Sequence, residues 1–164
     1  MGDLIEAFAQ LRLDSCICAI IGDGPERSRL EARVRERKLT AKVIFFGEKP
    51  FTKTIALLKS FDIFVNPSYT EGIPTAVIEA ALAKKAIIAT NVGGTAEIIS
   101  GNGDGFLIAP HDTDDLQKKL ALLIQNPSLR QTFGEQAFMS VQNKFSWDHA
   151  TKQYLELFSR LIKP

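Results

Sequence analysis

The chain has 164 residues, with 20 Lys and Arg against 19 Asp and Glu, so its formal net charge is +1. Because 45% of its residues are hydrophobic and 24% charged, the composition is that of a globular domain and excludes collagen, coiled coil and extended disorder. The balanced charge argues against a nucleic-acid partner, which would require a basic surface. The longest apolar stretch, at 17–21, is far shorter than the roughly 18 residues of a membrane span. The first residues lack the basic region of a secretory signal, so we expect a cytoplasmic protein.

Short apolar runs alternate with longer amphipathic segments over residues 1–110. In chain order the pattern predicts helix 4–11, strand 15–21, helix 26–38, strand 43–46, helix 55–59, strand 63–65, helix 74–84, strand 86–89, helix 95–99 and strand 105–108. For residues 111–164 it predicts helices 112–125, 128–143 and 147–162, with Asp114, Ser128 and Ser146 near their N-caps. Such alternation indicates one α/β domain over 1–164, a doubly wound parallel sheet with helices on both faces, followed by C-terminal helices.

The cysteines and histidines do not indicate a metal site or a disulfide. Cys16 and Cys18 lie two residues apart in a strand, on one face, where a bond between them would be badly strained. His111 follows a strand as a surface-loop residue, and His149 has no metal-ligating residue three or four positions away on its helix. We therefore expect core thiols and no bound metal.

The segment 66–75 carries the strongest chemical signal. It joins a strand to a helix, and ligands of parallel sheets bind at the carboxyl ends of strands. Pro74 suits the first helical position, and Gly72 permits a ligand to approach the backbone closely. The unpaired N–H groups and positive dipole of the helix start favour phosphate, and the Thr75 hydroxyl stands beside them.

Two carboxylates flank this helix start. Glu71 precedes the helix, and Glu79 follows eight residues later, about 12 Å along the axis. Helical side chains lean toward the N-terminus, so both carboxylates can face one ligand. Each alone has a structural explanation, as a dipole-stabilising or a solvated group. Together they suit a diphosphate with a sugar on one side and a ribose on the other, both donating hydroxyl hydrogen bonds.

The stretch 67–80, PSYTEGIPTAVIEA, resembles the Glu-x7-Glu motif of retaining family 4 glycosyltransferases. Further segments resemble the same family in order along the chain: the glycine-rich turn 20–27, the strand 43–47, the segments 90–97 and 105–110, and the helix start 145–147. The resemblance covers essentially the whole chain. It identifies the carboxyl-terminal, nucleotide-sugar-binding domain of a GT-B enzyme, with a Rossmann-like fold.

The resemblance implies a donor site for a nucleotide-diphosphate sugar, used without an essential metal or a further cofactor and with retention of anomeric configuration. The residues it assigns are Glu71, Gly72 and Ile73 to the donor sugar; Gly72, Ile73 and Thr75 to phosphate; Glu79 to ribose; Glu48, Lys49 and Phe51 to the base; and Gly22, Gly24, Gly93 and Gly94 as loop contacts. No residue is assigned as a catalytic nucleophile. Polysaccharide biosynthesis is the pathway that the family most often serves.

The chain departs from the family pattern at its start. The family domain begins with a strand and a Gly-Arg…Lys-Gly loop, whereas here the first segment matches the helix that follows them. We therefore expect that strand, its cationic pair and the N-terminal acceptor domain to be absent, and the isolated chain to be inactive. The missing strand would lie between those ending near Gly22 and Pro67. Either these two pair directly, another segment or chain lies between them, or the sheet is disturbed.

The final helix normally crosses to the partner domain, so its apolar face is expected to be uncovered, although Trp147 and Tyr154 are predicted to pack it. A homo-oligomer through this helix or the incomplete sheet follows as a hypothesis. A membrane-peripheral position of the parent protein stays open, because many such enzymes use lipid-linked acceptors.

Two other functions compete with glycosyl transfer. An oxidoreductase would use a Gly-x-Gly-x-x-Gly turn, but here Arg27 takes the third glycine position and the next strand does not end in an acidic residue. A non-catalytic nucleotide-binding or structural fragment is the second alternative. The basic residues of 27–38 are interrupted by glutamates and indicate a solvated helix face.

Overall fold

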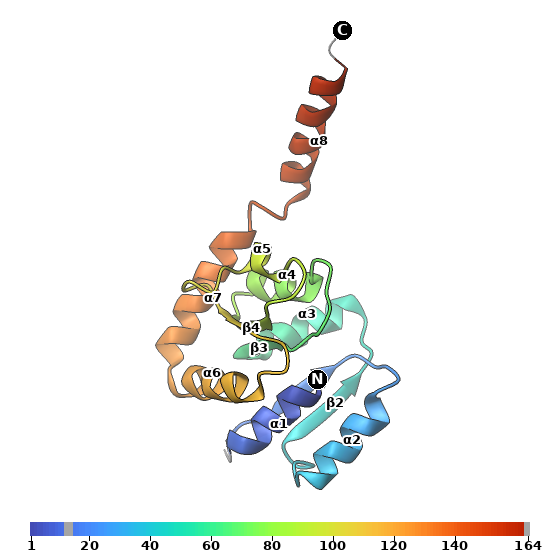
Figure 1. Ribbon diagram of the computed structural model, residues 1–164, viewed down its shortest axis with the longest axis vertical. Helices are drawn as coiled ribbons and strands as arrows, with labels where there is room; N and C mark the ends of the chain where they lie inside the picture. The colour runs from blue at the N-terminus through green and yellow to red at the C-terminus, as the bar shows by residue number, and fades with distance from the viewer. Residues whose placement is uncertain (12–14, 163–164) are drawn as a thin grey trace.

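The computed structural model describes residues 1–11 and 15–162 and confirms an α/β fold of parallel strands flanked by helices (Figure 1). The elements in chain order are α1 (Gly2–Leu11), β1 (Cys18–Ile21), α2 (Arg27–Glu36), β2 (Val43–Gly47), α3 (Phe51–Ser60), β3 (Ile63–Asn66), α4 (Thr75–Leu82), β4 (Ala86–Thr90), α5 (Thr95–Ile98), β5 (Phe106–Ile108), α6 (Thr113–Gln125), α7 (Pro127–Val141) and α8 (Trp147–Leu161). Every predicted element is present. The largest differences are β1, which begins three residues later than predicted, and α3, which is ten residues long.

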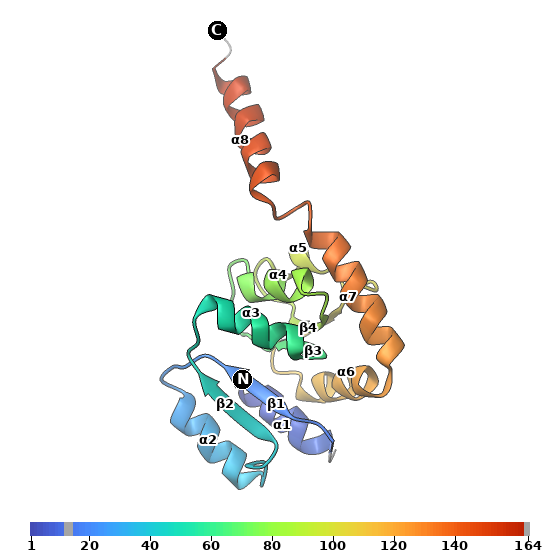
Figure 2. The same ribbon diagram turned by 180° about the vertical axis from the view of Figure 1, so that it is seen from behind.

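The strands form two separate parallel sheets. One pairs β1 with β2, and the other has the order β3-β4-β5. Among the described residues β1 pairs only with β2, so the direct pairing of β1 with β3 does not occur. Figure 2 shows the β1–β2 pair with α1 and α2 beside the other sheet. A groove of about 600 Å³ runs between β1 and β3.

The core has two halves, one on each face of β4. Ala86 and Ile88 belong to the half that contains α1, β1, α2 and α6. Ile87 and Ala89 belong to the half that contains α3, α4 and α5. All five residues of β4 are buried because this strand has neighbours at both edges and helices on both faces. Helix α1 packs against α6 and thereby connects the smaller sheet to the larger one.

The helix starts differ in detail from those predicted. Pro74 takes the N-cap of α4 with extended backbone, and its carbonyl accepts the first helical hydrogen bonds, from Val77 and Ile78. Asp112 caps α6 by accepting from the N–H of Asp115 at 2.9 Å, and Asp114 lies in the first turn, near the N-cap as predicted. The α7 helix begins at Pro127, with Asn126 rather than Ser128 at its N-cap. Ser146 caps α8 as predicted.

Helix α8 projects away from the rest of the molecule (Figures 1 and 2) and buries none of its side chains. The uncovered apolar face is therefore present, but the predicted packing of Trp147 and Tyr154 is wrong, since they are 89% and 62% exposed. The reason is that no other element lies beside the helix. Within the described part of the chain, no helix is long and apolar enough to span a bilayer.

Candidate functional site

The loop between β3 and α4 is held in place by the glycine turn that follows β4. The N–H of Gly94 donates to the carbonyl of Gly72 at 2.6 Å. A side chain at Gly93, whose φ is +53°, would overlap the carbonyl oxygen of Glu71. The structure thus brings Glu71 and Gly72 of one motif into contact with Gly93 and Gly94 of another. They meet because the carboxyl ends of β3 and β4 lie at the same edge of the sheet.

Side chains at the same edge support this loop from inside the sheet. The Asn66 amide donates to Oε1 of Glu71 at 3.3 Å, and Oδ1 of Asn66 accepts from the hydroxyl of Ser68 at 2.9 Å. The buried hydroxyl of Thr90 donates to the carbonyls of Asn66 and Ser68. Sequence reasoning missed Asn66 and Thr90. The one feature that could have indicated them is their position, because each is the last residue of its strand.

The start of α4 is open to solvent. Gly72, Ile73, Thr75 and Ala76 are all exposed, and nothing lies within 4 Å of the position that a side chain at Gly72 would occupy. The first N–H groups of a helix have no acceptor within it, and they carry the positive end of its dipole. A group with negative charge can therefore approach the Gly72 backbone and the Thr75 hydroxyl without displacing a side chain.

Glu79 lies further along α4 and is half-buried. Its side chain lines the groove between β1 and β3, together with Asn66, Ala76 and Thr54. Desolvation by burial raises the pKa of Glu79 above its usual value of 4.5. Asn66 therefore borders the groove that Glu79 lines and also binds the other carboxylate, Glu71.

The segment 48–51 is connected to the groove that Glu79 lines by way of Thr54 in helix α3. The Lys49 ammonium donates to the Phe46 carbonyl at 2.5 Å, and the hydroxyl of Thr54 donates to the Lys49 carbonyl at 3.3 Å. Thr54 lines the same groove as Glu79. Phe51 is 67% exposed, and Glu48 is exposed as well. Phe51 therefore offers an exposed aromatic side chain at the start of the helix that carries Thr54.

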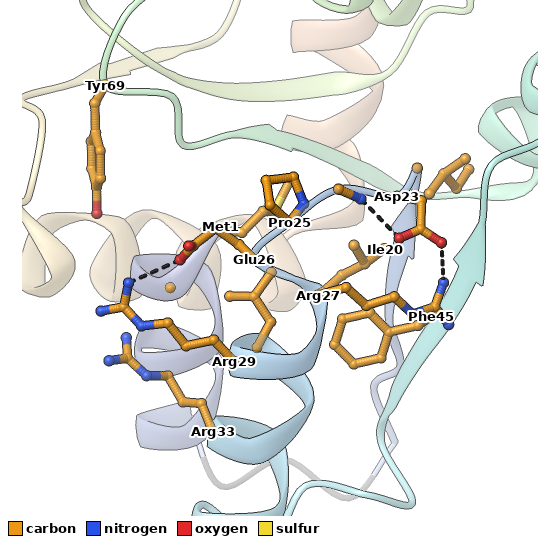
Figure 3. A pocket seen from close by; sticks show the side chains of 15 residues that line it. Met1, Ile20, Asp23, Pro25, Glu26, Arg27, Arg29, Arg33, Phe45 and Tyr69 are labelled. Carbon is orange, nitrogen blue, oxygen red and sulfur yellow. Dashed lines mark hydrogen bonds and ion pairs between the residues drawn. The ribbon is translucent and has the colours of Figure 1, made fainter.

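Gly22 and Gly24 lie at a second hollow of about 440 Å³, beyond the end of β1 (Figure 3). Arg27 ion-pairs with Asp23 at 2.7 Å and with Glu31 at 2.9 Å. The N–H of Gly24 and the Arg27 guanidinium lower the pKa of the Asp23 carboxyl. The Arg27 guanidinium is therefore paired with two carboxylates.

Tyr69 connects this hollow to the β3–α4 loop. Figure 3 shows Tyr69 extending from that loop toward the hollow, while Arg29 and Arg33 come from α2. The Tyr69 hydroxyl donates to Oδ1 of Asp3 at 2.9 Å, and its ring stacks on His111 with centroids 4.0 Å apart. Gly22 and Gly24 therefore border the same hollow as Tyr69 of the β3–α4 loop.

The described residues contain no group of three His, Cys, Asp or Glu side chains placed to hold a metal ion. Cys16 and Cys18 are free, and burial raises the pKa of the Cys18 thiol to about 11. The arrangement therefore offers backbone N–H groups, hydroxyls and two separated carboxylates, which suit binding of a polyhydroxylated anion.

Comparison with curated proteins finds glycosyltransferases. An uncharacterised glycosyltransferase of Methanocaldococcus jannaschii is 28% identical over 98% of this chain and 42% of its own length. An N-acetylgalactosaminyltransferase of Campylobacter jejuni, acting on N,N'-diacetylbacillosaminyl-diphospho-undecaprenol, is 36% identical over 66% of this chain and 29% of its own. The chain therefore spans about two fifths or less of the length of these relatives.

Solved structures show the same fold. A glycosyltransferase from Rickettsia africae matches with a TM-score of 0.89 and 28% identity, covering 98% of this chain and 44% of that one. The sucrose-phosphate synthase of Thermosynechococcus elongatus matches with a TM-score of 0.86 and 27% identity, covering 98% and 41%. The family model described as glycosyl transferases group 1 matches residues 2–139. The chain therefore belongs to the group 1 glycosyl transferases.

Proposed function

We propose that the chain binds a nucleotide-diphosphate sugar, the donor for a retaining, metal-independent glycosyl transfer of the family 4 type. The observation that carries the proposal is the open start of α4, preceded by Glu71, with Glu79 further along the helix in the groove that Asn66 also borders. Membership of the group 1 glycosyl transferases supports it. The structure of TarM of Staphylococcus aureus in complex with UDP, 25% identical with a TM-score of 0.86, also supports it.

In this proposal the diphosphate lies at the α4 start. The backbone of Gly72 and Ile73 and the hydroxyl of Thr75 supply hydrogen bonds to its oxygens, and the helix dipole stabilises its charge. The same groups stabilise the charge that develops on the leaving diphosphate as the bond between it and the anomeric carbon of the sugar breaks and the acceptor oxygen bonds to that carbon. Because these donors are fixed by the fold, they need little reorganisation during the reaction.

The two carboxylates have different tasks in this proposal. Glu71 accepts hydrogen bonds from hydroxyls of the transferred sugar, and the Gly93–Gly94 turn fixes the backbone that carries it. Glu79 accepts from the ribose hydroxyls in the groove, and the base lies beyond it against Glu48, Lys49 and Phe51. Ionisation of Glu79 is costly in the half-buried site, so two ribose hydrogen bonds would compensate for the lost hydration.

We infer that these 164 residues bind the donor without completing transfer, because the relatives continue over more than half of their length outside the matched region. The acceptor we propose is a growing polysaccharide or a lipid-linked glycan. One relative is named for a diphospho-undecaprenol-linked sugar and another for capsular polysaccharide biosynthesis, and both names support this class.

Calorimetric titration with UDP, GDP and ADP, with and without EDTA, tests the proposal. We expect one nucleotide to bind, EDTA to leave its affinity unchanged, and Glu79→Ala to weaken it about tenfold or more. Glu156→Ala on the exposed helix α8 is the matched control and should leave binding unchanged. No binding by a folded chain would favour the structural-fragment alternative, and equal loss in both variants would contradict the role proposed for Glu79.

A further inference from the structure

Tyr69 joins the loop that carries Glu71 to two other parts of the chain. Its hydroxyl donates to Oδ1 of Asp3, in the first turn of α1, at 2.9 Å. Its ring stacks on that of His111, between β5 and α6, with centroids 4.0 Å and planes 26° apart. One side chain of the β3–α4 loop therefore connects this loop to segments near both ends of the sequence.

The backbone on either side of Glu71 is fixed by hydrogen bonds. The Ser68 carbonyl accepts from the buried hydroxyl of Thr90 at 2.5 Å. The Gly72 carbonyl accepts from the N–H of Gly94 at 2.6 Å. Glu71 lies between these two carbonyls, so the direction of its side chain depends on the short interval 69–71.

The Glu71 carboxylate is held weakly by its own contact. The Asn66 amide donates to it at 3.3 Å, which is long for a hydrogen bond between N–H and oxygen. Tyr69 supplies a further hold on the backbone that carries Glu71, because its ring and its hydroxyl are both bound by groups outside the loop. Fixing a tyrosine costs little conformational entropy, since its side chain has only two rotatable angles.

His111 takes part in the stack with a left-handed backbone. Its φ is +65°, which residues other than glycine seldom adopt and which costs free energy unless other contacts favour it. The stack on Tyr69 is such a contact. Both side chains are exposed, that of Tyr69 by 48%, so the stack lies at the surface and not in the core. Its effect is therefore on the two loops that it joins.

We propose that Tyr69 is a positioning residue: held by Asp3 and His111, it orients the loop so that the Glu71 carboxylate faces the transferred sugar. This inference rests on the proposed function, because it assigns Tyr69 to the same donor site. Tyr69 need not touch the sugar. The nucleotide is proposed to bind through the start of α4 and Glu79, which Tyr69 does not hold. Loss of Tyr69 should therefore weaken binding of a nucleotide sugar more than binding of the nucleotide alone.

Calorimetry of the full chain measures this difference. UDP-glucose, GDP-mannose and ADP-glucose are each titrated beside UDP, GDP and ADP, and each pair gives the ratio of the two affinities. For the pair that the parent chain binds, Tyr69→Ala should lower this ratio about fivefold. Tyr69→Phe keeps the stack and loses the hydroxyl, so it should lower the ratio about twofold. Tyr154→Ala, at the other tyrosine of the chain, on exposed α8, is the matched control and should leave the ratio unchanged.

Variants of the two partners separate positioning from stability. His111→Gly removes the ring and suits the left-handed backbone, so the ratio should fall about twofold or more without a loss in the free energy of unfolding. Asp3→Asn retains an acceptor oxygen and should keep the parent ratio, whereas Asp3→Ala should lower it as Tyr69→Phe does. The double variant Asp3→Ala and Tyr69→Phe should lose no more than either single variant, because both remove the same hydrogen bond.

Hydrogen exchange tests the loop without a ligand. The Gly94 amide donates to Gly72, so Tyr69→Ala should speed its exchange about threefold or more, and Tyr154→Ala should not. Unchanged Gly94 exchange, or an unchanged affinity ratio in Tyr69→Ala, would overturn the role of Tyr69 and leave donor binding intact. No binding of any of the six compounds to the folded parent chain would instead overturn the donor proposal, and this inference with it.

Discussion

Gly93 lies directly against the carbonyl oxygen of Glu71, at a φ of +53° that side chains rarely adopt. The carbonyl of Gly72 stands 2.7 Å from where a Cβ on Gly93 would be. The turn after β4 therefore determines how the loop after β3 can run. That loop carries Glu71, the carboxylate proposed to bind the donor sugar. The position of Glu71 therefore depends on Gly93, which need not touch any ligand.

Gly93→Ala should therefore destabilise the fold and displace Glu71. The added methyl group overlaps backbone that cannot rotate away, and the positive φ adds strain, so we expect a loss of about 1–3 kcal/mol in the free energy of unfolding. Urea denaturation measures it. Gly24→Ala is the control, because a Cβ there meets open space, and its stability should change little. Equal stability of the two variants would contradict the packing described for Gly93.

Gly72→Ala should weaken nucleotide binding and leave the stability of the fold nearly unchanged. A Cβ on Gly72 has nothing within 4 Å, so the free energy of unfolding should change by less than about 1 kcal/mol. The methyl group would stand where a ligand approaches the α4 start, and nucleotide affinity should fall about tenfold or more. Denaturation and calorimetry on the same preparation test both parts. Unchanged nucleotide affinity would place the phosphate elsewhere.

Asn66→Leu tests whether the carboxylate of Glu71 must be held. Its amide donates to Glu71 at 3.3 Å, and removing one hydrogen bond of this kind costs about 1 kcal/mol. We expect affinity for the nucleotide sugar to fall about fivefold and affinity for the nucleotide alone to fall less. Ser68→Ala removes the hydrogen bond on the other side of Asn66 and serves as the comparison. An equal loss for both ligands would mean that Asn66 acts on the fold and not on the sugar.

The order of elements could be predicted because apolar runs and turn residues are local signals. The strand β3 and the helix α4 were predicted as 63–65 and 74–84, close to their observed bounds Ile63–Asn66 and Thr75–Leu82, and with them the loop that carries Glu71. The sequence left several arrangements of β1 and β3 open, and their separation was one of them. Hydrophobic periodicity indicates that a strand forms, but it does not indicate which strand pairs with its edge. The role of Asn66 was not predictable either, because its partner Glu71 is set by the path of a loop.

The exposed aromatic residues of α8 show the limit of amphipathicity as a guide. An apolar stripe predicts that something covers a helix face, and Trp147 and Tyr154 were therefore expected to pack. The stripe is present, but no part of the described chain contacts it. Periodicity reveals the face of a helix and does not reveal which partner covers it.

Glu79→Gln should stabilise the protein in a pH-dependent way. Burial raises the pKa of Glu79, so the folded state disfavours its ionised form. Below the usual carboxyl value of 4.5 the group is protonated in both states and carries no penalty. As pH rises through the higher folded pKa, the penalty develops and remains at neutral pH. The glutamine variant should therefore melt at a higher temperature than the parent at about pH 7 and at a similar one near pH 4.

Thermal unfolding at several pH values measures this difference. Glu156→Gln, on exposed α8, should show no such pH dependence. If Glu79→Gln changes the melting temperature by the same amount at every pH, the change arises from packing and not from ionisation of Glu79. If the same substitution also weakens nucleotide binding, then the carboxylate is retained for binding at a cost in stability.

Helix α8 should make the isolated chain self-associate. Tyr154, Phe158 and Leu161 lie along one stripe and are 62%, 52% and 70% exposed, and a stripe of this kind favours association in water. Burying each such side chain contributes about 1.5–3 kcal/mol, so even a small helix–helix contact is favourable. We expect sedimentation velocity to show concentration-dependent dimers or larger species, and the double variant Phe158→Lys and Leu161→Glu to sediment as a monomer. Lys152→Gln on the same helix should not change the distribution, and a monomeric parent chain at high concentration would disprove the prediction.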